Sequence, residues 1–243
     1  PYSGRDVIAD AHRAAHRALE SGHATVIVTP LDGNAAALVV TETGTRHGSL
    51  GEASLDAAAT SVASDVLRDG SRVESIGDRR FFFDRQAPPM TLVIVGAGQI
   101  AMSLTRMARE LDMRSIVIDG RERYATPERF PDADELCVGM PSDIVAGISP
   151  NHRVAVALVA HDYKYELPVL RQLLRAPVGY IGMLGSKKRG AAVRELLREE
   201  GFTDEELARI HTPIGLDLGG KSPPEVALSI LAEVVAVRSG KRE

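Results

Sequence analysis

The length, composition and charge of the chain exclude several classes of protein. Its 243 residues carry a net charge of −4 and are 44% hydrophobic, enough for two modest cores, and its basic residues are interleaved with acidic ones, so nucleic acid is not expected as a partner. The apolar runs are too short to cross a membrane, Cys137 cannot form an internal disulfide and no signal segment opens the chain, so we expect a cytoplasmic protein.

Residues 1–85 predict a small α+β domain. We expect, in chain order, a helix, two β-branched strands, a third short strand, an alanine-rich helix and a strand with three phenylalanines (residues 5–21, 24–29, 36–41, after Gly44, 52–68 and 79–84). Pro88 and Pro89 then give residues 86–90 the composition of an interdomain linker.

From residue 91 onward, strands alternate with helices, which is typical of a parallel sheet with helical crossovers. The candidate strands are residues 91–95, 115–119, 135–139, 153–160 and 178–183. The C-terminal part is mainly helical, and Thr203 with Glu206 and Ser222 with Glu225 show the pattern of a helix-capping box. We therefore expect an α/β chain in which a Rossmann-like, mostly parallel sheet with flanking helices (residues 91–243) follows the small α+β domain.

The first strand of this second domain runs into a glycine loop. Buried-strand residues lead into Gly96-Ala97-Gly98-Gln99-Ile100-Ala101 and then a helix. The first glycine permits a tight turn, the second lets the backbone approach a pyrophosphate, and Ala101 can stand in for the third glycine. Free amides at the helix start favour a phosphate. The candidate cofactor-binding residues are Gly96, Ala97, Gly98, Gln99 and Ile100.

An acidic residue ends the next strand. Asp119 stands at the spacing of about 20 residues from the glycine loop at which a carboxylate accepts hydrogen bonds from ribose hydroxyls. Arg121 and Arg123, just beyond it, are compatible with a 2′-phosphate or another anion. Alternatively, the loop only turns the chain, and the pocket is vacant or holds a different phosphate-bearing ligand.

Three later segments carry further candidates. His161 and Asp162 follow the longest apolar strand, at the edge where parallel sheets collect ligands, or they form only a local hydrogen bond. Gly182, Gly185, Ser186 and Lys187 end a strand and open a basic helix, which suits a phosphate clamp or a solvated helix end. His211 and Asp217 precede the last capped helix and suggest a second anion site, although ordinary capping also explains that segment.

Four motifs resemble the xanthine dehydrogenase accessory protein family (XdhC/CoxI). They are Ala-Thr-Pro-Glu-Arg-Phe-Pro, Val-Ala-His-Asp, Tyr-Ile-Gly-Met-Leu-Gly-Ser-Lys-Lys-Arg and His-Thr-Pro-Ile-Gly-Leu-Asp-Leu-Gly (residues 125–131, 159–162, 180–189 and 211–219). The resemblance implies a maturation factor that binds molybdenum cofactor, assists its sulfuration and delivers it to xanthine dehydrogenase or a related molybdenum hydroxylase. It also implies that the chain is a cofactor chaperone and not an enzyme, with the hydroxylase and a cysteine desulfurase as partners. We expect a homodimer.

The chain departs from this family in its first domain, which commonly carries a Gly-Gly-Cys-x-Glu element. The corresponding residues 48–56 read Gly-Ser-Leu-Gly-Glu-Ala-Ser-Leu-Asp and contain no cysteine. Because a thiolate is the natural ligand of a metal–sulfur centre, we do not expect this segment to ligate molybdenum. Binding through pterin and phosphate alone, or through a cysteine upstream of Pro1, stays open.

Two other functions remain as alternatives. In an NAD(P)-dependent oxidoreductase, His161 would lie near the reacting carbon and Asp119 on the adenosine ribose. In a nucleotide-binding regulatory module, the same pocket would bind its ligand without turnover. The histidines near the N-terminus show no zinc spacing, so no metal site is expected.

Overall fold

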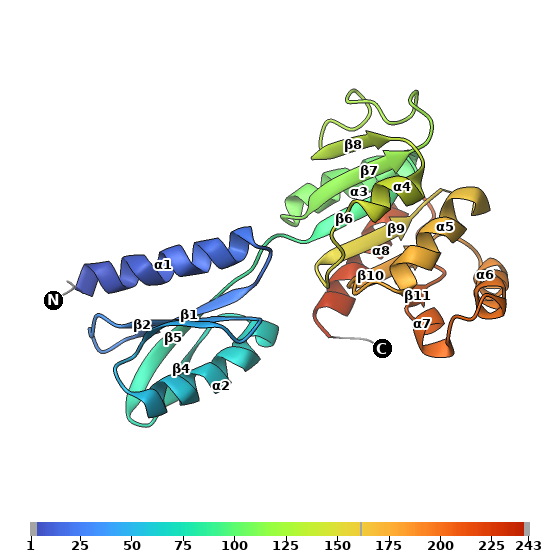
Figure 1. Cartoon of the computed structure of the whole chain (residues 1–243). Coiled ribbons are helices and arrows are strands. Elements are labelled where there is room, and N and C mark those ends of the chain that lie inside the picture. Colours follow the sequence, from blue (N-terminus) through green and yellow to red (C-terminus); the bar gives the residue numbers. More distant parts are fainter. Residues whose placement is uncertain (1–3, 161, 241–243) are drawn as a thin grey trace. The chain divides into compact units, whose positions relative to one another are not determined.

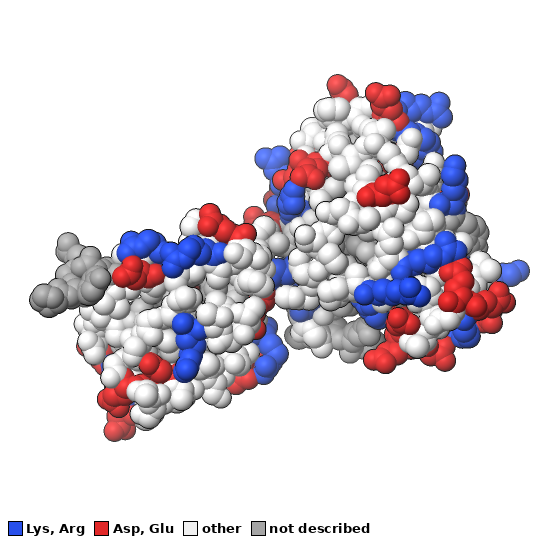
Figure 2. All heavy atoms as spheres, in the orientation of Figure 1, with Lys and Arg blue, Asp and Glu red and all other residues white. Residues whose placement is uncertain are grey.

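The computed structural model describes residues 4–160 and 162–240, and the chain divides into two compact units, residues 1–88 and 89–243 (Figure 1). Within the described residues, no helix is both long and apolar enough to cross a membrane. On the face drawn in Figure 2, both units carry Lys and Arg among Asp and Glu, as the interleaved charges of the sequence predict.

The described part of the first unit is a five-stranded antiparallel sheet between two helices, with strand order β3-β2-β1-β5-β4. Its elements are α1 (Gly4–Glu20), β1 (Thr25–Pro30), β2 (Ala37–Thr41), β3 (Arg46–Ser49), α2 (Ala53–Asp69), β4 (Arg72–Ile76) and β5 (Arg79–Gln86). Alternate residues of β1 face opposite helices: Ile27 packs with α1, and Val26 and Val28 pack with α2. The central strand is therefore buried on both faces.

Two details of this unit differ from the sequence-based expectations. Strand β4 was not predicted, because its sequence Arg-Val-Glu-Ser-Ile alternates exposed and half-buried residues without a continuous apolar run. Of the residues predicted as a linker, Gln86 is the last residue of β5, and Met90 is buried in the core of the second unit. The connection between the two units is therefore shorter than residues 86–90.

The second unit confirms the predicted Rossmann-like fold. Its described elements are β6 (Thr91–Val95), α3 (Gln99–Glu110), β7 (Arg114–Asp119), β8 (Glu135–Val138), α4 (Pro141–Ala146), β9 (Val154–Leu158), α5 (Tyr163–Leu174), β10 (Tyr180–Met183), α6 (Lys187–Glu199), α7 (Asp204–Ala208), β11 (Ile210–His211) and α8 (Pro223–Arg238). All paired strands are parallel, in the order β11-β10-β9-β6-β7-β8. The two-residue strand β11 was not predicted because it is too short to leave a pattern.

Helices cover both faces of the parallel sheet (Figure 1). Leu92 and Ile94 of β6 pack with α3 and α8, whereas Val93 and Val95 pack on the opposite face with residues of α5 and α6. Burial on both faces explains why the strands read as continuous apolar runs. The capping boxes are also present, since Glu206 accepts a hydrogen bond from the Thr203 amide and Glu225 accepts one from the Ser222 amide.

The strand order places a topological switch point between β6 and β9. The chain runs outward from β6 through β7 to β8, and then returns to the other side of β6 to start β9. At such a point the connections leave the carboxyl ends of neighbouring strands in opposite directions, which opens a crevice where ligands of this fold class bind. The fold therefore directs attention to the residues just after Val95 and Leu158.

Candidate functional site

Gly96 lets the ends of β6 and β9 approach each other. It has φ +111°, and a Cβ at this position would lie 2.7 Å from the Ala160 amide nitrogen and 2.9 Å from its Cβ. The Gly96 amide donates to the Ile118 carbonyl at 2.8 Å, and the Val159 amide donates to the Val95 carbonyl at 2.9 Å. Both the backbone conformation and the packing therefore require glycine.

Gly98 leaves the start of α3 open. It is the N-cap residue, with an extended backbone, and a Cβ built on it would meet nothing within 4 Å. No described side chain caps this end, and the first turn contains no acidic residue. The backbone amides of the first turn of α3, including those of Gln99 and Ile100, have no hydrogen-bond partner inside the helix. This end of the helix is therefore suited to bind an anion.

Asp119 ties the glycine loop to the neighbouring arginine. One carboxylate oxygen, Oδ2, accepts from the Ala97 amide at 2.8 Å and from Arg121 Nη2 at 2.9 Å, and Oδ1 accepts from the Arg121 amide and Nε, both at 2.9 Å. Burial by itself raises the pKa of Asp119, but the bonds from Arg121 and the Ala97 amide outweigh it and hold the pKa below its ordinary value. Asp119 is therefore ionised and already bonded within the protein.

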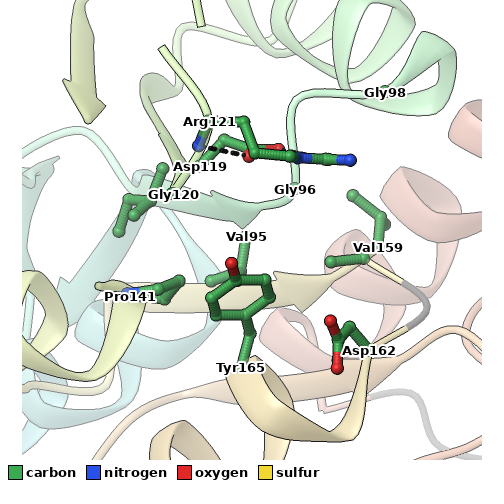
Figure 3. A pocket seen from close by; sticks show the side chains of 12 residues that line it. Val95, Gly96, Gly98, Asp119, Gly120, Arg121, Pro141, Val159, Asp162 and Tyr165 are labelled. Carbon is green, nitrogen blue, oxygen red and sulfur yellow. Dashed lines mark hydrogen bonds and ion pairs between the residues drawn. The ribbon is translucent and has the colours of Figure 1, made fainter. Parts of the chain in front are cut away.

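These residues border a cavity of about 460 Å³ at the switch point (Figure 3). Five of the residues singled out in the sequence line it: Gly96, Gly98, Asp119, Arg121 and Asp162. Val95, Ile118, Gly120, Pro141, Val159, Ala160 and Tyr165 complete the lining. Asp162 also caps α5, because its Oδ1 accepts from the Lys164 amide at 2.9 Å. His161 lies outside the described residues.

The predicted clamp at the end of β10 does not line this cavity. Gly182 is required for packing, since a Cβ there would lie 2.5 Å from Ile214 Cδ1 and 2.6 Å from the Tyr180 hydroxyl. Ser186 caps α6 by accepting from the Arg189 amide at 3.2 Å, and Gly185 packs beside the Arg189 side chain. Lys187 is exposed at the first position of α6.

The last two candidates also lie apart from the cavity. His211 Nδ1 is 2.9 Å from Oε1 of Glu233 in α8, and the other oxygen of that carboxylate accepts from the Tyr180 hydroxyl and the Gly215 amide. Asp217 lies exposed in the loop before α8. The His211 segment is therefore held by a structural network, and it does not form part of the switch-point cavity.

A buried ion pair links α5 and α6, the helices that follow β9 and β10. Glu166 of α5 is 0% exposed, and its Oε2 lies 2.5 Å from Nη2 of Arg189 in α6. Arg189 Nη1 also donates to the Leu184 carbonyl at 2.9 Å. Burial raises the pKa of Glu166 to about 7, against the opposing effect of the Arg189 charge. The pair joins the first turns of the helices that follow β9 and β10.

Several lining residues were not predicted from the sequence, including Gly120, Pro141 and Tyr165. Tyr165 could have been found, because the first turn of a helix that follows a candidate strand returns past the same sheet edge. Among the residues that the structure describes, no group of three or more His, Cys, Asp or Glu side chains is placed to hold a metal ion.

Comparison with known proteins decides the family. A family model described as the XdhC Rossmann domain matches residues 92–234, which is more than half of the chain. The chain belongs to the XdhC family. The match covers the whole switch-point cavity of this XdhC domain, from Val95 to Tyr165.

The XdhC chain also resembles individual proteins. A protein of Bacillus subtilis (strain 168), named as a probable xanthine dehydrogenase subunit, is 29% identical over 157 residues, covering 65% of this chain and 46% of that protein. The "Molybdenum cofactor insertion chaperone PaoD" of Escherichia coli (strain K12) is 38% identical over 89 residues, covering 37% and 28%. The XdhC chain therefore spans less than half of the length of these curated relatives.

A solved structure supports the fold of the XdhC chain over nearly its full length. It is a crystal structure described as a xanthine dehydrogenase from Bacillus halodurans, and it matches with a TM-score of 0.76 and 23% identity, covering 97% of this chain and 68% of that one.

Proposed function

We propose that this chain is an accessory protein that binds molybdenum cofactor in the switch-point cavity and delivers it to xanthine dehydrogenase or a related molybdenum hydroxylase. The cofactor is cargo, bound and then released, so the chain itself needs no catalytic group. The membership of the XdhC family and the likeness to a protein named as a molybdenum cofactor insertion chaperone support this function.

The observation that carries the proposal is the anion site formed by Arg121 and the open end of α3. Arg121 lines the cavity with half of its side chain exposed, while Asp119, at 3% exposure, holds it by two hydrogen bonds. A Cβ on Gly98 would meet nothing within 4 Å, so the space beside the start of α3 is open. A phosphate attached to a pterin fits this arrangement, because amides, a helix dipole and a guanidinium all favour its charge.

For sulfuration of the cargo, we propose that the sulfur comes from a partner protein. The 243 residues contain one cysteine, Cys137, which is half-buried and is not among the residues lining the cavity. Burial raises the pKa of its thiol, which keeps it protonated at neutral pH and therefore a poor nucleophile. We accordingly propose that a cysteine desulfurase supplies the sulfur while the chain holds the cofactor. The homodimer expected from the sequence analysis remains a prediction.

An NAD(P)-dependent oxidoreductase is the second candidate, because Arg121 follows the acid at the end of β7, where a 2′-phosphate would bind. The bonds that already occupy Asp119 weigh against it, since a ribose would have to compete with the Ala97 amide and Arg121 for the carboxylate. A regulatory module would bind a nucleotide in the same cavity without transferring it.

A transfer assay separates these functions. The chain, preloaded with molybdopterin cofactor and freed of excess, is mixed with cofactor-free xanthine dehydrogenase, and recovery of hydroxylase activity is followed. We expect faster recovery than with the same concentration of free cofactor. Equal rates with and without the chain, at concentrations where the cofactor is bound, would contradict delivery.

Arg121→Gln should weaken binding of molybdopterin roughly 10-fold, because a charge-assisted hydrogen bond to the phosphate is lost. The matched control is Arg123→Gln. Both guanidinium groups lie over the Tyr124 ring, at 4.2 Å and 4.9 Å from its centroid, but only Arg121 lines the cavity. Fluorescence titration of the cofactor measures both affinities, and an equal loss in the two variants would argue against a specific phosphate site.

A further inference from the structure

The switch-point cavity has two chemically different sides. Gly98 and Arg121 provide amides and a guanidinium on the side of α3. Across the cavity, Pro141 provides apolar surface, and Tyr165 is the aromatic side chain among the described lining residues (Figure 3). Helix α3, which begins after Gly98, and helix α5, which carries Tyr165, pack on opposite faces of the sheet. A ligand that fills the cavity therefore meets a phosphate site and an aromatic ring together.

The helical turn that carries Tyr165 is held on both sides of this residue. Asp162 caps the start of α5 just before it, and the next residue, Glu166, is locked in the buried pair with Arg189. Because the turn that carries Tyr165 is fixed at both ends, the backbone from which its side chain reaches the cavity is preorganised.

Gly120 makes room for the edge of this ring. Its φ lies outside the left-handed region, so the backbone does not require glycine there. A Cβ at this position would lie 3.1 Å from the Tyr165 hydroxyl oxygen and 3.4 Å from Cζ. A Cβ at position 120 would therefore press on the hydroxyl, and the ring would have to shift by a few tenths of an ångström.

From this arrangement we infer that Tyr165 is a binding residue on which a flat, conjugated heterocycle of the bound molecule stacks while its phosphate lies against Arg121 and α3. The inference deepens the proposed function and rests on it, because the pterin of the cargo is such a heterocycle. Tyr165 is half-buried and lines the cavity, and Lys164 Nζ lies over one face of its ring at 5.8 Å from the centroid, so we expect the ligand on the opposite face. Stacking of a heterocycle on an aromatic side chain changes affinity by about 5-fold to 150-fold in related sites.

The test compares two substitutions of the same residue. Molybdopterin, NADPH and inorganic pyrophosphate are titrated in turn into the wild-type chain, Tyr165→Leu and Tyr165→Phe. We expect Tyr165→Leu to lose roughly 10-fold in affinity for molybdopterin. Tyr165→Phe should bind it nearly as well as the wild type, because the ring remains, and pyrophosphate binding should be the same in all three proteins. Thermal unfolding of each variant shows that it is folded.

A second pair of variants tests the role of Gly120. Gly120→Ala should weaken molybdopterin binding, because its methyl group presses on the Tyr165 hydroxyl. The double variant Gly120→Ala/Tyr165→Phe removes that hydroxyl and leaves an ordinary contact with the ring, so it should recover most of the affinity. A general loss of folding would not be rescued in this way.

The outcomes separate this inference from the proposed function. If the wild type binds molybdopterin and Tyr165→Leu binds it equally well, or Tyr165→Phe binds it as poorly as Tyr165→Leu, the stacking role is wrong and the proposed function stands. If the wild type binds NADPH instead, and Tyr165→Leu weakens that binding, the stacking role stands and the proposed cargo is wrong. Failure of the wild type to bind either molecule overturns both.

Discussion

Gly96→Ala should destabilise the second unit by about 3 kcal/mol or more and abolish cofactor binding. Alanine is strained at φ +111°, and its Cβ would overlap the amide nitrogen and the Cβ of Ala160. Gly96, just after β6, lies against Ala160, just after β9. Relief of this overlap therefore has to move apart the ends of the two strands that form the cavity. Urea unfolding of the purified variant measures the loss of stability.

The matched control for this variant is Gly98→Ala. Gly98 has φ −88°, which alanine adopts without strain, and its new Cβ would meet nothing within 4 Å. We expect a stability within roughly 1 kcal/mol of the wild type, since the lower entropy of the unfolded chain with alanine opposes the loss of glycine, a better N-cap residue than alanine. Molybdopterin binding should still fall at least 10-fold, because the methyl group takes up open space that the phosphate needs in order to approach the amides at the start of α3. Unchanged binding in this variant would mean that the ligand does not reach the start of α3.

Arg189→Met should destabilise the protein by about 3–5 kcal/mol at pH 8, because it leaves the fully buried Glu166 carboxylate without its partner. The loss should be smaller at pH 6. Burial raises the pKa of Glu166 from 4.5 to about 7, so the stability linked to this group is complete below 4.5 and is lost as the pH rises through 7. Removal of the Arg189 charge raises that pKa further, and the variant can then protonate the carboxyl at pH 6.

Arg171→Met provides the comparison for this second prediction. Arg171 and Glu200 also form a two-bond pair, with both contacts at 2.6 Å, but their side chains are 43% and 36% exposed. An exposed pair contributes less than about 1 kcal/mol, and its removal should show little dependence on pH between 6 and 8. Denaturant unfolding at the two pH values tests both variants. Equal losses of stability in the two variants would show that the burial of Glu166 does not determine how much the ion pair contributes to the free energy of unfolding.

The glycine loop could be predicted from the sequence because its requirements are local. A buried strand, a turn that needs glycine and a helix start follow one another within residues 92–101, and the structure places them as expected. The α/β fold could be predicted for a similar reason, since continuous apolar strands alternate with helices. The strand β4, whose pairing with β5 does not depend on an apolar run, left no comparable signal.

The partners of the candidate residues could not be predicted, because they come from elsewhere in the chain. The position of Asp119 at the end of β7 was right, but the bond from the Ala97 amide depends on how two loops meet. His211 bonds to Glu233 only because α8 packs beside β10 and β11. Gly182 was predicted to belong to a phosphate-binding loop. In the structure, the absence of a side chain at this position instead leaves room for Ile214 and Tyr180.

The cavity itself depends on strand order. The sequence places several loops at the carboxyl edge of the sheet, but it does not show which two strands flank the switch point. The order β10-β9-β6 puts the loop after β10 one strand away from the crevice, and α5 instead brings Tyr165 into it. Residues on the first turn of a crossover helix are therefore lining candidates that a search for motifs overlooks.

Parallel calorimetric titrations of the purified chain with molybdopterin and with NADPH test the central claim most directly. We expect molybdopterin to bind at one site per chain and Gly98→Ala and Arg121→Gln to weaken this binding, while NADPH gives no heat of binding. Saturable binding of NADPH that the same two substitutions weaken, with no binding of molybdopterin, would contradict the proposed function.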